Sequence, residues 1–135
     1  MHITGACHCG KITYEAEVDP DTVSVCHCTD CQTFSGSAFR TSLPAAKAGF
    51  RLLTGTPKIY VKTADSGNKR AQAFCPDCGT ALYATSVENQ QVFGLRTGTS
   101  HQRAQLIPKK QIWCNSAQAW AMDLKALPQS SRHPG

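Results

Sequence analysis

Residues 75–79 read Cys75-Pro76-Asp77-Cys78-Gly79, a tight Cys-x-x-Cys knuckle. Its two thiolates can approach one cation, and backbone amides that follow the first cysteine can donate to its sulfur. Gly79 tolerates the positive φ that closes such a turn. Knuckles of this kind come in pairs, so a second pair of thiols is expected elsewhere in the chain.

The partner pair lies near the N-terminus, in Cys7-His8-Cys9-Gly10. On an extended backbone the side chains of Cys7 and Cys9 point to the same side and can share one ion. Together, Cys7, Cys9, Cys75 and Cys78 predict a closed site for one structural Zn²⁺ that joins two halves of one domain. The alternative is that Cys7 and Cys9 are buried apolar residues beside an unrelated turn.

Eight cysteines in 135 residues must be a disulfide framework, a metal framework or free thiols. The first residues, Met1-His2-Ile3-Thr4-Gly5-Ala6-Cys7, have neither the basic nor the apolar part of a signal peptide, and no stretch has the apolar length of a membrane span. We therefore expect a cytoplasmic protein with no membrane partner, in which thiols stay reduced and paired cysteines bind metal.

A different pattern occupies residues 26–31, which read Cys-His-Cys-Thr-Asp-Cys. Cys26, Cys28 and Cys31 offer three thiolates, and three ligands leave one position of a zinc ion open. In catalytic zinc sites that position takes water or substrate, and a thiol bound there loses its proton. These three cysteines therefore predict a second, catalytic zinc. His27 could complete the site instead, although its place between two ligating cysteines turns it to the opposite side.

Cys114 stands alone in the sequence. Such a residue is most often a small core residue. A fourth ligand of the open zinc and a redox thiol are the alternatives. Four histidines carry no motif and are expected to be surface or satisfied residues: His2, His8, His101 and His133.

Short strand-like runs, separated by Gly and Pro, predict a mainly β fold of small antiparallel sheets with little helix. The expected strands are residues 11–18, 38–43, 50–53, 58–63, 71–74, 81–84, 92–97 and 111–113. We expect one short helix at 29–34, a turn at 44–48 and a hairpin tip at 65–69. A single domain should cover residues 1–127, followed by a mobile tail at 128–135.

The net charge is +5, carried by Lys and Arg residues that are scattered along the chain. Nucleic-acid binding needs a clustered basic patch, and the sequence has no basic run. We therefore expect no nucleic-acid partner. A small anionic substrate fits the same charge.

The cysteine clusters, in this order, resemble the glutathione-dependent formaldehyde-activating enzyme (GFA) family, which includes centromere protein V-like domains. The resemblance covers most of the chain. Its elements are Gly5-Ala6-Cys7-His8-Cys9-Gly10 with Ile12-Thr13-Tyr14, Cys26-His27-Cys28-Thr29-Asp30-Cys31 with Ser35-Gly36-Ser37-Ala38-Phe39, Thr54-Gly55-Thr56-Pro57, Phe74-Cys75-Pro76-Asp77-Cys78-Gly79-Thr80-Ala81-Leu82, Gly98-Thr99, Pro108, Ile112-Trp113 and Trp120.

This resemblance implies a β-tent fold and a zinc-dependent carbon–sulfur lyase that adds the thiol of glutathione to formaldehyde or a related small aldehyde. It implies that the four cysteines of the two pairs hold a structural zinc, and that Cys26, Cys28 and Cys31 hold the catalytic one. One position departs from the pattern: Gln111 stands where many members carry His before the Ile-Trp pair, which puts any role of that His in doubt.

Two other functions fit parts of the sequence. A non-catalytic, zinc-stapled interaction module would have its three-cysteine site empty or filled by a fourth protein ligand. A redox enzyme is suggested by Cys114-Asn115-Ser116, which resembles the catalytic segment of B-type methionine sulfoxide reductases. Those enzymes are expected to hold zinc with two Cys-x-x-Cys pairs, whereas the first pair here is Cys-x-Cys. The sequence predicts no particular oligomeric state.

Overall fold

The computed structural model describes residues 1–133, which contain two β-sheets and one α-helix. The smaller sheet has strand order β1-β2-β5 and consists of β1 (His2–Ala6), β2 (Thr13–Glu17) and β5 (Phe50–Thr54). The larger sheet has strand order β10-β3-β4-β9-β8-β7-β6 and consists of β3 (Ser24–Cys26), β4 (Arg40–Ala46), β6 (Lys58–Thr63), β7 (Lys69–Phe74), β8 (Ala81–Ser86), β9 (Val92–Arg96) and β10 (Lys110–Ile112).

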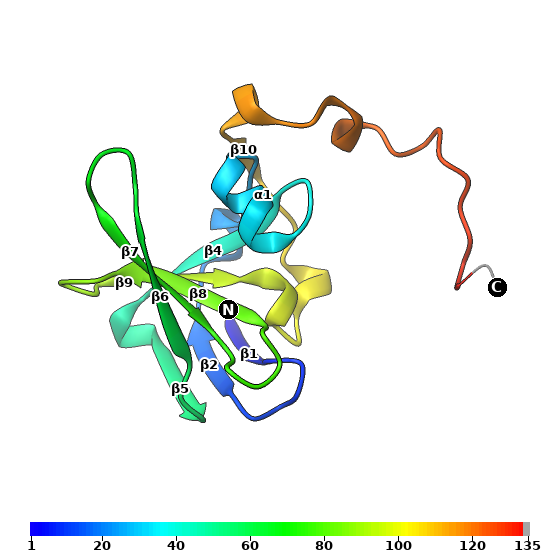
Figure 1. Cartoon of the computed structure of the whole chain (residues 1–135). Coiled ribbons are helices and arrows are strands. Elements are labelled where there is room, and N and C mark those ends of the chain that lie inside the picture. Colours follow the sequence, from blue (N-terminus) through cyan, green and yellow to red (C-terminus); the bar gives the residue numbers. More distant parts are fainter. Residues whose placement is uncertain (134–135) are drawn as a thin grey trace.

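Helices are short. The α-helix, α1 (Thr29–Ser35), lies beside β4 and β10 (Figure 1). Single 3₁₀ turns occupy Pro20–Thr22, Lys47–Gly49, Thr97–Thr99, Arg103–Gln105, Cys114–Ser116 and Ala119–Met122. All strand pairs are antiparallel except β10 and β3, which run parallel. The expected mainly β fold with little helix, which a β-tent implies, is confirmed.

Local sequence patterns account for several elements. Along β2, Tyr14 and Ala16 are buried while Glu17 is exposed, which is the alternation of a strand with one face in the core and one in water. Cys28 caps the N-terminus of α1, and Gly36 ends the helix with a φ of 62°. The predicted hairpin tip at 65–69 joins the antiparallel strands β6 and β7.

Three features of the fold differ from the prediction. Strands β1 and β3 were not predicted, since β1 contains a glycine and β3 has only three residues. The turn expected at 44–48 is partly strand, because β4 continues through Pro44 to Ala46. Since β3 pairs only with residues 40–42 of β4, the missing N–H of Pro44 breaks no ladder hydrogen bond.

The hydrophobic core lies between the two sheets. The small sheet contributes Ile3 and Tyr14, and the large sheet contributes Leu43 and Leu95 on the opposite side. Phe50 joins the two layers, with ring centroids 5.9 Å from Tyr14, 5.2 Å from Tyr83 and 4.9 Å from Phe93. Cys7 and Cys75 belong to this core, so the loops that carry them begin inside the packed interior.

Beyond β10 the chain leads away from the sheets as an extended arm (Figure 1). Trp113 begins it with a φ of 57°, and both Trp113 and Trp120 are about 60% exposed. The predicted tail begins at 128, and its last two residues, 134–135, lie outside the described residues. A domain boundary at 127 stays a prediction. No helix within residues 1–133 has the length and apolar character needed to cross a membrane.

Candidate metal centres

The first group of sulfurs forms where two loops meet. Cys7 and Cys9 follow the end of β1 in a turn closed by the Gly10 N–H, which donates to the Cys7 carbonyl at 3.0 Å. The expected extended backbone is therefore replaced by a turn. Cys75 and Cys78 lie between β7 and β8 in the predicted knuckle, where the Gly79 N–H donates to the Cys75 carbonyl at 2.8 Å.

These two loops converge although 66 positions separate Cys9 from Cys75. All four Sγ atoms lie within 4.8 Å of one another. The Sγ of Cys9 lies 3.6 Å from that of Cys7 and 3.7 Å from that of Cys75. Tetrahedral zinc with Zn–S bonds of about 2.3 Å requires sulfurs about 3.8 Å apart, so this donor set fits zinc. The group can hold a metal ion.

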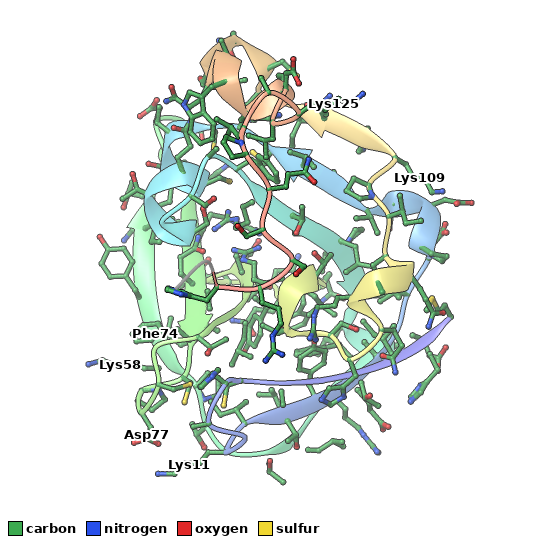
Figure 2. All side chains as sticks on the ribbon, turned by 90° about the vertical axis from the view of Figure 1, so that its right-hand side faces the viewer. Lys11, Lys58, Phe74, Asp77, Lys109 and Lys125 are labelled. Carbon is green, nitrogen blue, oxygen red and sulfur yellow. The ribbon has the colours of Figure 1, made fainter. Side chains whose placement is uncertain are left out.

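Hydrogen bonds hold the two loops together around the sulfurs. The Thr80 hydroxyl accepts from the His8 N–H at 3.1 Å and lies 3.2 Å from the Cys78 Sγ. At the surface, Lys11 Nζ contacts Asp77 Oδ2 at 3.3 Å, so opposite charges also join the two loops (Figure 2). The His8–Thr80 hydrogen bond and the Lys11–Asp77 ion pair join the loops without any contribution from a metal.

Without a metal the four thiols compete for negative charge, and the pKa values of Cys78 and Cys7 are lowered while that of Cys9 is raised. The Thr80 hydroxyl, followed by backbone N–H groups, lowers the pKa of Cys78 to about 5. The Lys11 N–H lowers the pKa of Cys9, but loss of hydration and the neighbouring sulfurs outweigh it and raise this pKa to about 11. A divalent cation relieves the competition because it stabilises all the thiolates at once.

The second group forms where β3 passes into α1. Cys26 ends β3, Cys28 is the helix N-cap and Cys31 lies in the first helical turn. The Cys31 N–H donates to the Cys28 Sγ at 3.2 Å, which fixes the cap. The three Sγ atoms lie within 4.8 Å of one another, and no other Cys, His, Asp or Glu of residues 1–133 joins them.

The electrostatics of this group favour a thiolate on Cys28. Burial raises the pKa of the Cys28 thiol, but hydrogen bonds from Cys31 and Cys26 and the positive charge of Arg40 together lower it below its ordinary value. Burial and the Cys28 thiolate raise the pKa of Cys31 to about 12. As in the first group, a cation is needed before all three sulfurs can ionise together.

His27 does not join the three sulfurs. Its Nε2 lies 2.8 Å from Oε1 of Gln111, and its backbone N–H donates to the Ile112 carbonyl at 3.1 Å. The ring is 1% exposed, and its Nδ1 has no hydrogen-bond partner in the described part of the chain. The alternative that His27 completes the metal site is therefore not what the structure shows.

Cys114 lies in the exposed arm that follows β10 and belongs to neither sulfur group. The expectation of a core residue is wrong, because the chain leaves the packed body of the domain just before this position. Its use as a fourth ligand to Cys26, Cys28 and Cys31 is also excluded in this conformation. A redox role stays a prediction.

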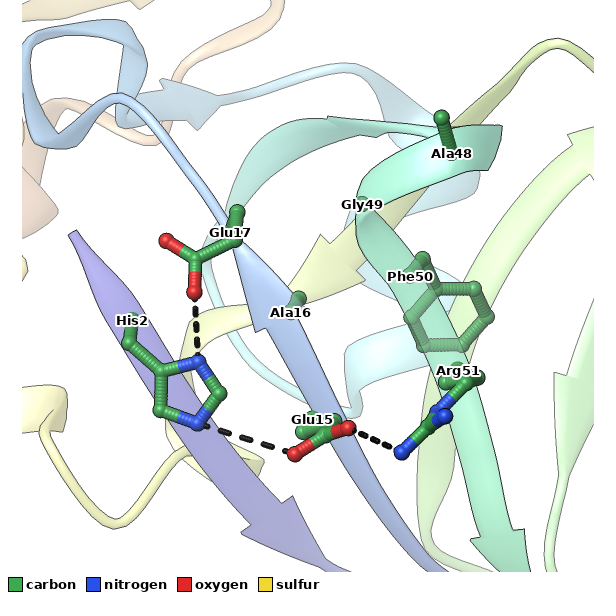
Figure 3. A pocket seen from close by; sticks show the side chains of 8 residues that line it. All are labelled: His2, Glu15, Ala16, Glu17, Ala48, Gly49, Phe50 and Arg51. Atoms are coloured by element: carbon green, nitrogen blue, oxygen red, sulfur yellow. Dashed lines mark hydrogen bonds and ion pairs between the residues drawn. The ribbon is translucent and has the colours of Figure 1, made fainter.

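His2 is a satisfied surface histidine, as expected. Its ring contacts Glu17 at 2.6 Å and Glu15 at 3.7 Å, and Glu15 also contacts Arg51 (Figure 3). These side chains line a shallow cavity of about 230 Å³ on the small sheet. Since its charges are paired with one another and it contains no cysteine, this cavity is not the candidate active site.

A second cavity, of about 380 Å³, contains two arginines that carry no sequence motif, Arg40 and Arg96. The available signal was an arginine at the end of the apolar run Val92-Phe93-Gly94-Leu95, where a charge is costly to bury. Strand prediction alone does not reveal which face of the sheet such a side chain occupies. These two residues are the functional candidates that sequence reasoning missed.

Two sheets with two groups of clustered cysteine sulfurs, each able to hold a metal ion, define a cysteine-rich β protein with two candidate metal sites. Comparison with protein families is more specific. The model of the family described as glutathione-dependent formaldehyde-activating enzyme matches residues 2–116, and the chain belongs to this family. The resemblance noted in the sequence is thereby confirmed.

A solved structure shares the fold. The crystal structure of a Rhodobacter sphaeroides protein, a structural genomics target, is similar with a TM-score of 0.62 at 18% sequence identity. The similarity covers 80% of this chain and 98% of that one. At this identity the likeness shows the fold alone.

Proposed function

We propose that this protein adds the thiol of a small molecule such as glutathione to formaldehyde or a related small aldehyde, which is a carbon–sulfur lyase reaction in reverse. The family supports the reaction type. The observation that carries the site is the group of three sulfurs on Cys26, Cys28 and Cys31, with no fourth donor beside them among residues 1–133. The cytoplasm is the proposed location, because its reducing conditions keep all eight thiols free.

In this reaction a sulfur–carbon bond forms, the carbon–oxygen double bond becomes single, and the thiol proton ends on the aldehyde oxygen. Zinc bound by the three cysteines would supply a Lewis acid that lowers the pKa of a substrate thiol. The chain itself positions the site, since the helix cap fixes Cys28 and the Arg40 charge favours negative sulfur there. The other four cysteines are proposed to hold a second, structural zinc.

The test is the rate of adduct formation with glutathione and formaldehyde, followed by NMR exchange against the spontaneous reaction. Zinc-loaded protein should accelerate the exchange. Cys28→Ser should remove the acceleration while circular dichroism shows an intact fold, and Cys114→Ser is the matched control that keeps full activity. If the wild-type protein leaves the spontaneous rate unchanged, the proposed reaction is wrong and a non-catalytic interaction module is favoured.

A further inference from the structure

The cavity of about 380 Å³ lies against one face of the large sheet, with α1 beside it. Phe34 of α1 and Tyr60 of β6 form an aromatic wall, their ring centroids 6.1 Å apart. Arg40 lies over the Phe34 ring, with its guanidinium carbon 5.9 Å from the centroid. The volume of the cavity falls in the range of small-molecule sites and is too small for a macromolecule.

Strand register places this cavity beside the three-sulfur group. Paired residues on neighbouring strands share a face, and so do residues two apart on one strand. Cys26 pairs with Arg40, and Ser42, two residues further on, pairs with Arg96. Cys26, Arg40 and Arg96 therefore project from the same face, opposite to the core.

Arg96 is buried to an unusual degree for its charge, with 8% of its surface exposed. Its Nη1 donates to the Gly94 carbonyl at 3.0 Å and its Nη2 donates to Gln72 Oε1 at 3.1 Å. Both acceptors are neutral, and its buried Nε has no hydrogen-bond partner in the described part of the chain. Burial and the nearby Arg40 lower the pKa of Arg96 to about 9, so it still carries its charge at neutral pH.

None of the ion pairs within residues 1–133 involves Arg40 or Arg96. Burying a guanidinium without a carboxylate is costly, and such charges are normally paired. The sulfur group offers only partial compensation, because three thiolates around a divalent zinc would carry one net negative charge against two positive ones. Neither guanidinium has a carboxylate partner, and Arg96 donates only to neutral acceptors.

We infer that this cavity is a carboxylate-binding subsite in which Arg96 and Arg40 hold the acidic end of a thiol whose sulfur reaches the three-cysteine group. The placement of the substrate sulfur at the three-cysteine group rests on the proposed function. The placement of the carboxylate at the two arginines does not. Arginine presents paired donors that match the two oxygens of a carboxylate. The Phe34 and Tyr60 rings provide apolar contact for the carbon chain. These two arginines would select, among small thiols, those that carry a carboxylate.

The test uses S-methylglutathione, which keeps both carboxylates but has no thiol to react or to bind metal as a thiolate. Binding of this acid and of its dimethyl ester to zinc-loaded protein is measured by calorimetry. We expect the acid to bind at least about tenfold more tightly, as charge-assisted hydrogen bonds to a buried arginine provide. Arg96→Met should abolish this preference. Arg70→Met, on the same sheet but outside the cavity, should keep it.

Equal binding of acid and ester to the wild-type protein overturns the subsite, and so does a preference that survives Arg96→Met. If Arg96→Met does not fold, Arg40→Met decides in the same way. Zinc content is measured on each variant, because arginines that only balance thiolate charge would lose zinc and affect both probes alike. Binding of this probe does not depend on the addition reaction. A carboxylate preference in a protein that fails the glutathione and formaldehyde assay would therefore refute the proposed reaction and leave the subsite standing.

Discussion

His27 Nε2 and Gln111 Oε1 lie 2.8 Å apart, although 84 positions separate the two residues in the chain. An amide oxygen only accepts, so the imidazole Nε2 carries the proton of this hydrogen bond. The contact fixes the buried residue between Cys26 and Cys28 against β10. Gln111, which departs from the family pattern, therefore has a defined structural partner in this chain.

Replacing Gln111 by Ala should destabilise the protein. The substitution leaves the His27 Nε2–H buried without an acceptor, which costs about 1–3 kcal/mol. Urea denaturation measures the difference. The matched control is Lys110→Ala on the same exposed strand, expected within about 0.5 kcal/mol of wild type. Equal stabilities for the two variants would show that this hydrogen bond contributes nothing to folding.

Losing one ligand of the four-sulfur group should affect the whole fold. Cys75 is fully buried, and its loop meets the Cys7 loop through the sulfurs. Cys75→Ser should therefore lower the metal content by one ion per chain and the free energy of unfolding by more than about 3 kcal/mol. Cys28→Ser should also lose one ion per chain, but its melting temperature should stay near that of the wild-type protein. Metal analysis and thermal unfolding report both quantities, with Cys114→Ser as the control.

This prediction fails if Cys75→Ser keeps both ions, or if metal-free protein in a strong chelator melts like the loaded form. Either result would mean that hydrogen bonds alone hold the two loops together. The hydrogen bond between His8 and Thr80 and the ion pair between Lys11 and Asp77 would then be sufficient.

Gly5 allows β1 to pass directly beneath the ring of Tyr14. A Cβ on residue 5 would lie 2.3 Å from Tyr14 Cζ, and the ring is held by the core and by a 2.8 Å hydrogen bond from its hydroxyl to Thr99. Gly5→Ala should thus cost about 1–3 kcal/mol. Gly98→Ala, where an added Cβ meets no atom within 4 Å, is the control. In a Tyr14→Ala background the cost of Gly5→Ala should vanish.

The ion pair between Asp30 and Lys62, at 2.5 Å, joins α1 to β6. Half of the Asp30 side chain is exposed, so water and salt screen the pair. A double-mutant cycle with Asp30→Asn and Lys62→Met should give a coupling below about 1 kcal/mol that weakens further in 1 M salt. A larger coupling energy that does not depend on salt would mean that this ion pair contributes substantially to the packing of α1 against the sheet.

Sequence reasoning succeeded where the physical cause is local. The alternation in β2, the short helix α1 and the β6–β7 hairpin each depend on residues close together in the chain. Sequence reasoning failed where the position of a neighbouring strand determines the structure of a residue. Pro44 is tolerated inside β4 only because β3 ends beside it, and Cys114 is exposed because the chain leaves the sheet at that point.

Metal-ligand motifs depend on the spacing of residues that are close in the chain. The sequence alone therefore reveals the cysteine clusters of residues 7–9, 26–31 and 75–78 and the family that they indicate. The sequence does not show that the 7–9 and 75–78 clusters join in one site, because the meeting of their two loops depends on how both sheets pack around one core. The same holds for the contact between His27 and Gln111 and for the cavity with Arg96. Register between distant strands puts these side chains together, and no short-range pattern specifies register.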